Sequence, residues 1–222
     1  MLPDWLPWLL QVNDSQFPSG AYAHSLGLEA LVQGGLVSDA ESLARFLNDQ
    51  ISPALLAFDL PMLARAHAAA VARNIGALGT IDHELDGWKL AEELRLASRR
   101  MGSRRLALLR RLDPCPWLDD FARLGSPQHQ IVVAAVEMRE LPVEVAAWAQ
   151  AHQSLNGYVT AAVKLLRLGQ ERAQAVLREA LVSLAPGVPA AVAAPADPGW
   201  FNPLLEIASL RHARARERLF IS

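Results

Sequence analysis

The sequence predicts an all-α fold, built as a single helical-bundle domain of roughly 8 to 10 helices. Apolar residues recur at three- and four-residue spacing along nearly all of the 222 residues, and strict alternation is almost absent. Several stretches carry helix start signals, and no central stretch is long and loop-like enough to separate two domains. Residues 1–222 are therefore expected to share one core, which a chain of this length can bury.

Two helix start signals lie between residues 38 and 61, and each is followed by a proline. Ser38 and Glu41 have the spacing of a capping box, in which the hydroxyl accepts a first-turn amide and the glutamate reaches back. The helix that they start meets Pro53, which ends or restarts it because proline lacks an amide hydrogen. Asp59 followed by Pro61 then indicates the start of another helix.

The next segments are expected to form a turn, a helix and a loop. Residues 74–80 have the composition of a turn, and a helix with one apolar side follows from Thr80 or Asp82. The acids of residues 82–86 then fall in its first turn, where the helix dipole favours negative charge. Residues 112–117 form a loop that joins two helix pairs.

The second half of the chain is predicted to be helical with one irregular segment. Ser126 and Pro127 indicate an N-cap and first position, although the apolar residues 131–136 also fit a buried strand. Pro142 starts a long helix or a broken pair of helices. Residues 185–203 are rich in Pro, Ala and Gly and are interpreted as a tether to a C-terminal helix over 204–220.

Composition favours a cytoplasmic protein. There is one cysteine, Cys115, so no disulfide can form within the chain. No run of about 18 uncharged apolar residues occurs, so no membrane-spanning helix is expected. The N-terminal residues carry prolines and an acid and lack the basic start of a secretory signal.

The net charge of −2 provides no overall field for nucleic acid, but two arginine clusters stand out. Six arginines lie between Arg99 and Arg111 without an acid among them, and four more lie between Arg211 and Arg218. Either cluster can bind phosphate or an acidic protein face, or can simply form a solvated helix face.

Motifs for catalysis are weak. The segment AHSLG resembles a nucleophile elbow around Ser25, but the 24 preceding residues contain no strand that could deliver the serine to such a turn. A P-loop needs Gly-Lys-Ser or Gly-Lys-Thr, and the two lysines, Lys89 and Lys164, both lie outside such a context. No two histidines have the spacing of a dedicated metal site. We therefore expect no catalytic residues, no resident metal and no stably bound cofactor.

Five separated segments, in the right order along the chain, resemble the urease accessory protein UreF family. They are PSGAYAHSLGLEALVQGGLV, DLPMLAR, EELRLASRRMG, LRLGQERAQ and SLRHARARERLFIS. The matching positions include Pro18, Gly20, Tyr22, Ser25, Gly27, Glu29, Asp59, Pro61, Arg65, Glu93, Arg95, Gly102, Gly169, Gln170, His212, Arg218, Leu219 and Phe220. His24 and Leu26 depart from the pattern, because family members usually carry a second aromatic and then His or Gln there.

The resemblance implies a helical fold without catalysis of its own, and a homodimer in many members. Such proteins join a UreD-type scaffold, also called UreH, and the UreG GTPase in a complex that delivers nickel to apo-urease. Nickel and GTP are then handled by the complex. The expected role is an adaptor that modulates GTP turnover, with no nucleic acid and no membrane as partner.

The last helix is the preferred partner-binding element, because an apolar terminal segment needs a groove either in the chain's own body or in the scaffold. His212 on this helix is a weak candidate for a transient nickel ligand. The alternative function is a helical nucleic-acid or regulatory binding module that uses the arginine clusters. A serine hydrolase acting through Ser25 is the remaining, weaker alternative.

Overall fold

The computed structural model describes residues 2–193 and 198–222, and within them it is helical with no strand, in one helical domain. This confirms the predicted fold class. The α-helices are α1 (Leu6–Asn13), α2 (Leu28–Gln33), α3 (Ala40–Phe46), α4 (Ser52–Ala54), α5 (Leu60–Val71), α6 (Ile75–Trp88), α7 (Glu92–Leu112), α8 (Pro116–Arg123), α9 (Gln130–Glu137), α10 (Val143–Leu166), α11 (Gln170–Leu184), α12 (Val188–Ala193) and α13 (Pro203–His212). Short 3-10 turns lie at Ala21–Ala23 and Ala185–Gly187, and π-helical turns at Leu47–Ile51 and Leu55–Asp59.

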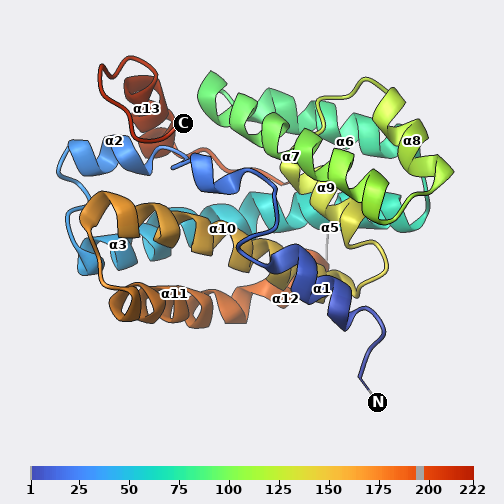
Figure 1. The fold of residues 1–222 in the computed structure, drawn as a ribbon, viewed down its shortest axis with the longest axis horizontal. Helices are drawn as coiled ribbons and strands as arrows, with labels where there is room; N and C mark the ends of the chain where they lie inside the picture. The colour runs from blue at the N-terminus through green and yellow to red at the C-terminus, as the bar shows by residue number, and fades with distance from the viewer. Residues whose placement is uncertain (1, 194–197) are drawn as a thin grey trace.

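The core is organised around α9, α5 and α10. Every residue of 131–136 is buried, because α9 is enclosed between α7 and α5. The long helix α10 packs against α11, α2 and α5 and so links the two sides of the molecule. Figure 1 shows α13 and the C-terminal end beside α2, far from the N-terminus. The segment that was ambiguous between strand and helix is therefore a core helix.

Residues 40–71 form one continuous helix rather than two. The prediction that Pro53 ends or restarts a helix and that Asp59 starts another is wrong, because each proline follows a π-helical turn whose wider spacing accommodates a residue that has no amide hydrogen. Asp59 has helical dihedral angles and caps nothing. The start is also displaced by one residue, since Asp39 is the N-cap and exchanges hydrogen bonds with Ser42, not Ser38 with Glu41.

The predicted turn at 74–80 is helical. Asn74 caps α6 by accepting a hydrogen bond from the Ala77 amide at 3.0 Å, so the helix begins earlier than Thr80 or Asp82. The chain that follows the predicted start is not one helix, since it is broken at 89–91, where the Arg95 guanidinium donates to the Lys89 carbonyl. Asp82 and Asp86 consequently lie inside α6 rather than in its first turn.

The helix signal at Ser126 and Pro127 is misleading, since α9 begins only at Gln130. A different helix accepts hydrogen bonds from the two amides that directly precede α9. The buried Asp82 carboxylate of α6 accepts from the Gln128 amide and, at 2.8 Å, from the His129 amide. A side chain distant in sequence therefore performs the function of an N-cap.

The C-terminal third differs from the prediction in two places. Pro142 does precede a helix, and α10 is a single helix of 24 residues. The predicted tether 185–203 is helical over 185–193 and irregular over 198–202, and residues 194–197 lie outside the described residues. The terminal helix ends at His212 instead of 220, and the chain continues from there as turns and an extended segment.

Two helices, Ala40–Val71 and Gln170–Ala193, are long and apolar enough to cross a membrane by length and composition alone. The first runs through the core, with more than half of its most apolar stretch buried inside the fold. Core helices of soluble proteins satisfy the same criterion, so these two helices are weak evidence for a membrane protein.

Candidate functional site

The centre of the candidate site is a buried carboxylate, Glu29, on α2. One of its oxygens accepts a hydrogen bond from His212 Nε2 at 3.0 Å and from the Phe220 amide at 3.0 Å. The other oxygen accepts from the Leu219 amide at 2.7 Å. Removing a carboxylate from water is costly unless its oxygens are bonded, and here they are bonded by groups some 183 to 191 residues away. Glu29 thus fastens the end of the chain to its beginning.

His212 connects this carboxylate to a second one. Its Nδ1 lies 3.0 Å from Glu93 on α7, and Glu93 also accepts from Arg218 at 3.2 Å. The imidazole is fully buried between the two acids. Three helices, α2, α7 and α13, therefore meet at one histidine, and the hydrogen bonds at its two nitrogens fix its orientation.

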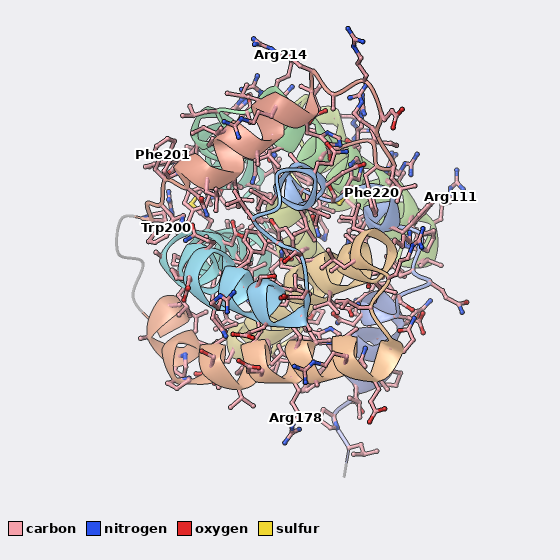
Figure 2. All side chains as sticks on the ribbon, turned by 90° about the vertical axis from the view of Figure 1, so that its left-hand side faces the viewer. Arg111, Arg178, Trp200, Phe201, Arg214 and Phe220 are labelled. Carbon is pink, nitrogen blue, oxygen red and sulfur yellow. The ribbon has the colours of Figure 1, made fainter. Side chains whose placement is uncertain are left out.

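Residues Arg218–Ser222, here called the C-terminal strap, lie alongside residues 23–26. The Ile221 amide donates to the Ala23 carbonyl at 2.9 Å, and the Leu26 amide donates to the Ser222 carbonyl at 3.2 Å. Phe220 points into the body, where the Lys164 ammonium lies 5.3 Å from its ring centroid. Figure 2 shows Phe220 within the fold, while Arg214 of the preceding turn extends into solvent.

The strap defines what Ser25 does. Ser25 is buried, its Oγ donates to the Ser222 carbonyl at 2.9 Å, and the same oxygen accepts from the Glu29 amide at 3.3 Å. No imidazole is bonded to this hydroxyl, and no strand precedes it in the described part of the chain. The hydrogen bonds of Ser25 therefore favour a structural contribution to the strap contact over the nucleophile-elbow hypothesis.

The two positions that depart from the family pattern also belong to this contact. His24 Nδ1 lies 2.7 Å from the Ser222 hydroxyl, so the histidine has a partner in spite of its unusual place. Leu26 has a φ of 52°, a left-handed conformation that a branched side chain rarely adopts. The flanking Gly27 has a φ of 90°, a left-handed conformation that favours glycine, and a Cβ there would be in ordinary van der Waals contact with Leu205 of α13 at 3.5 Å.

A second group of predicted residues holds the helices around the site. Arg65 forms a double hydrogen bond with Glu84, at 2.9 and 2.7 Å, which joins α5 to α6. Gly102 lets α7 approach the start of α9, because a Cβ there would lie 1.9 Å from the Gln128 carbonyl oxygen. Pro61 is buried within the continuous helix 40–71. These residues position the site without being part of its surface.

Asp59 lines a partly open pocket of about 170 Å³. Burial raises the pKa of Asp59, and the positive charge of Lys89 partly opposes that shift. Burial and the Asp59 charge together raise the pKa of the neighbouring Tyr158 above its ordinary value. Sequence reasoning identified Asp59, but it assigned no function to Lys89 or Tyr158.

Gly169 and Gln170 are not brought to the site. Both are exposed at the start of α11, and a Cβ on Gly169 would meet nothing within 4 Å. Pro18 is exposed as well. The structure gives no local reason for the identity of these three residues.

The arginine run between Arg99 and Arg111 is not one surface. Arg105 is buried and bonded to the buried Glu137, with further hydrogen bonds to Gln153 at 3.0 Å and to the Val12 carbonyl at 3.4 Å. Arg99 pairs with Asp86, and Arg110 with Asp119. The hydrogen bonds from Arg99 and His129 outweigh burial and hold the pKa of Asp86 below its ordinary value.

Sequence reasoning missed the Arg105–Glu137 pair, although a signal was present. Arg105 lies on the same helical side as the buried residues of α7, four positions after Met101 and four before Leu109. Glu137 ends an otherwise apolar run. A charge at an apolar position of each pattern indicates a buried ion pair.

The arrangement offers no metal centre within residues 2–193 and 198–222, where no group of three His, Cys, Asp or Glu side chains can hold an ion. Glu29 and Glu93 are bonded to opposite nitrogens of His212 and do not converge on one point. Neither imidazole nitrogen is free for nickel in this state.

Exposed apolar side chains mark the outer face of the strap. Leu219 and Ile221 are 66% and 54% exposed, while the alternate residues Phe220 and Ser222 are buried, as expected for an extended segment. Tyr22 is 69% exposed, next to Ala23, which accepts the Ile221 amide. We call Tyr22, Leu219 and Ile221 the seam patch. It can bind an apolar surface of another protein.

Comparison with known proteins gives a consistent result. A sequence model of the family described as UreF matches residues 37–181. A urease accessory protein UreF of Bacillus sp. (strain TB-90) is 33% identical, over 96% of this chain and 97% of that protein. The protein of the same name from Paenarthrobacter aurescens (strain TC1) is 33% identical over 96% of both chains, and that of Alkalilimnicola ehrlichii is 36% identical over 77% and 75%.

Proposed function

Because the chain belongs to the UreF family of urease accessory proteins, we propose that it matures urease as an adaptor without catalysis of its own. In this role it joins a UreD/UreH-type scaffold to the UreG GTPase in the cytoplasm, acts as a homodimer, and modulates GTP turnover while nickel is delivered to apo-urease. Nickel and GTP are then carried by the complex.

The observation that carries this proposal is the assembly of the signature at the strap. Hydrogen bonds join Ser25 and Glu29 from the start of the chain to His212, Leu219, Phe220 and Ser222 from its end, and Gly27 lies against α13. Their polar groups bond to one another and leave no reactive group exposed, which suits an interface better than an active site. The unit holds the seam patch at a fixed place on the surface.

The last helix supports this role differently from the sequence-based hypothesis. Helix α13 packs against α2 and α7 of the chain's own body, so it does not need a groove in a partner protein to cover its apolar side. The scaffold is instead proposed to bind the seam patch, which the docked helix and strap present. The alternative of a nucleic-acid module is disfavoured, because ion pairs and burial divide the larger arginine cluster.

The test is the double substitution Tyr22→Asp with Leu219→Asp. Both side chains are exposed, so circular dichroism and the melting temperature should not change, whereas binding to the purified scaffold should weaken at least about tenfold. Val71→Asp is the matched control, because Val71 is 59% exposed at the far end of α5. Size-exclusion chromatography of the mixed proteins, with GTP turnover by UreG as a second measurement, gives the answer. Unchanged complex formation by the double variant would contradict the proposal.

A further inference from the structure

A hollow on the surface lies where α7 faces the segment 19–24 and the strap. It consists of two adjoining spaces of about 210 and 500 Å³, and both are lined by His24, Arg100 and Ile221. A water molecule occupies about 30 Å³ in the liquid, so even the smaller space has room for several waters or a small ion. The hollow adjoins the seam patch at Ile221, and its other lining residues do not belong to that patch.

Two arginines at this hollow lack partners. Arg100 and Arg104 are exposed, lie one helical turn apart on α7, and have no hydrogen bond or ion pair in the described part of the chain. Their neighbours Arg99 and Arg105 on the same helix are both bonded to acids. Glu93, the acid on the rim, is already bonded to His212 and Arg218. Arg100 and Arg104 therefore carry positive charge that no acidic side chain among the described residues pairs with.

One of the two arginines, Arg104, packs against the signature segment, to which His24 also belongs. Gly20 has a φ of 81°, and a Cβ on it would lie 2.5 Å from an Arg104 guanidinium nitrogen, so this side chain lies directly against the Gly20 backbone. His24 is fixed through Nδ1 by the Ser222 hydroxyl, and its Nε2 has no partner among the described residues. Burial lowers the pKa of His24, and the charges of Arg100 and Arg104 lower it further. The positive charges of Arg100 and Arg104 therefore disfavour protonation of the His24 imidazole.

We infer that Arg100, Arg104 and His24 form a binding site for a phosphate group. Guanidinium groups bind phosphate through several hydrogen bonds at once, so two arginines on one face of a helix can bind the same phosphate together. A phosphate group carries about −1.5 to −2 charges near neutral pH and so balances two guanidiniums, whereas a single carboxylate leaves one uncompensated. The inference goes beyond the adaptor role and does not depend on it.

The experiment is a titration of the full chain with inorganic pyrophosphate, followed by the NMR signals of His24. Saturable binding is expected, together with a rise in the pKa of His24, because the anion compensates the two arginine charges and stabilises the protonated ring. Arg100→Gln with Arg104→Gln should weaken binding at least about tenfold. GDP is titrated in parallel. If GDP and pyrophosphate bind with equal affinity, the site recognises the phosphates alone. If GDP binds more tightly, the site recognises the nucleoside as well.

The matched control is Arg111→Gln with Arg178→Gln, which removes the same charge from exposed residues elsewhere (Figure 2). This variant should bind pyrophosphate within about twofold of the unmodified chain, since it alters only the screened long-range field. Three results would overturn the inference: no saturable binding, equal losses in the two double variants, or acetate binding as tightly as pyrophosphate. Far-UV circular dichroism of each variant excludes unfolding as the cause.

Discussion

Gly102 shows how one missing side chain sets the distance between two helices. The position where its Cβ would stand is 1.9 Å from the Gln128 carbonyl oxygen and 2.8 Å from the His129 carbonyl carbon. Both atoms belong to the backbone, so no rotation of a side chain can relieve the contact. The spacing between α7 and the start of α9, and with it the Asp82 capping contact, depends on this glycine.

Gly102→Ala should therefore destabilise the fold by about 3 kcal/mol, at the upper end of the cost of overpacking a core. Gly157→Ala is the control, because Gly157 lies inside α10 and a Cβ there would meet nothing within 4 Å. That change should stabilise the protein by about 0.5 to 1 kcal/mol through helix propensity. Urea unfolding of the two variants measures both effects. If the Gly102→Ala and Gly157→Ala variants are equally stable, the contact between α7 and the start of α9 is looser than described.

At the same scale, the sequence identifies residues better than it identifies their contacts. Glu29 and His212 can be singled out by their place in a family pattern, yet their contact spans 183 residues, and no local periodicity encodes such a distance. Arg105 is the opposite case. It appears to be one of six similar arginines until its helical position is compared with that of Met101 and Leu109.

Helix α9 illustrates a start that its own sequence does not encode. The two amides that directly precede it, those of Gln128 and His129, donate to Asp82, which lies in the middle of α6. The local signal, Ser126 before Pro127, indicates a different start, and the Ser126 hydroxyl has no hydrogen-bond partner in the described part of the chain. Propensity rules assume that caps are local, so they fail where another helix supplies the acceptor.

Asp82→Ala should cost about 2 to 4 kcal/mol, because two amides lose their acceptor at a buried place. Asp82→Asn should cost less, since the amide oxygen still accepts one hydrogen bond. Asp120→Ala provides the control at an exposed acid that, among the described residues, pairs with Arg123 on the surface, and it should change stability by less than about 0.5 kcal/mol. Thermal and urea unfolding can rank the three variants. Asp82→Ala behaving like Asp120→Ala would show that α9 does not need this cap.

Over the whole molecule, the fold class is predictable because it depends on many positions at once. Errors at Pro53, at residues 74–80 and at Ser126 move helix ends without changing the helical periodicity that places residues such as Val132 and Leu155 in the core. The candidate site is less predictable, because it forms only when α2, α7 and the C-terminal strap meet. Leu219 was selected from the family pattern, but its exposure beside the buried Phe220 could be known only from the structure.

The pairing of the two chain ends leads to a prediction for the molecule as a whole. Deleting Ile221 and Ser222 removes the acceptor of the Ser25 and Leu26 amides and the partner of the Ala23 carbonyl. Hydrogen exchange at Ser25 and Leu26 should then accelerate at least about tenfold, because local opening no longer has to break these bonds. The Val133 amide, bonded to the His129 carbonyl in the core, should keep its rate, since none of the strap's hydrogen bonds to the described residues reaches α9.

Ser222→Ala separates the backbone contact from the side-chain contact. It removes the hydroxyl that His24 Nδ1 meets at 2.7 Å but retains the carbonyl that accepts from Ser25 and Leu26. This variant should therefore preserve slow exchange at both amides, whereas the deletion should not. If the deletion leaves exchange at Ser25 and Leu26 unchanged, the strap does not fasten segment 23–29, and Glu29 alone must hold the two ends together through His212.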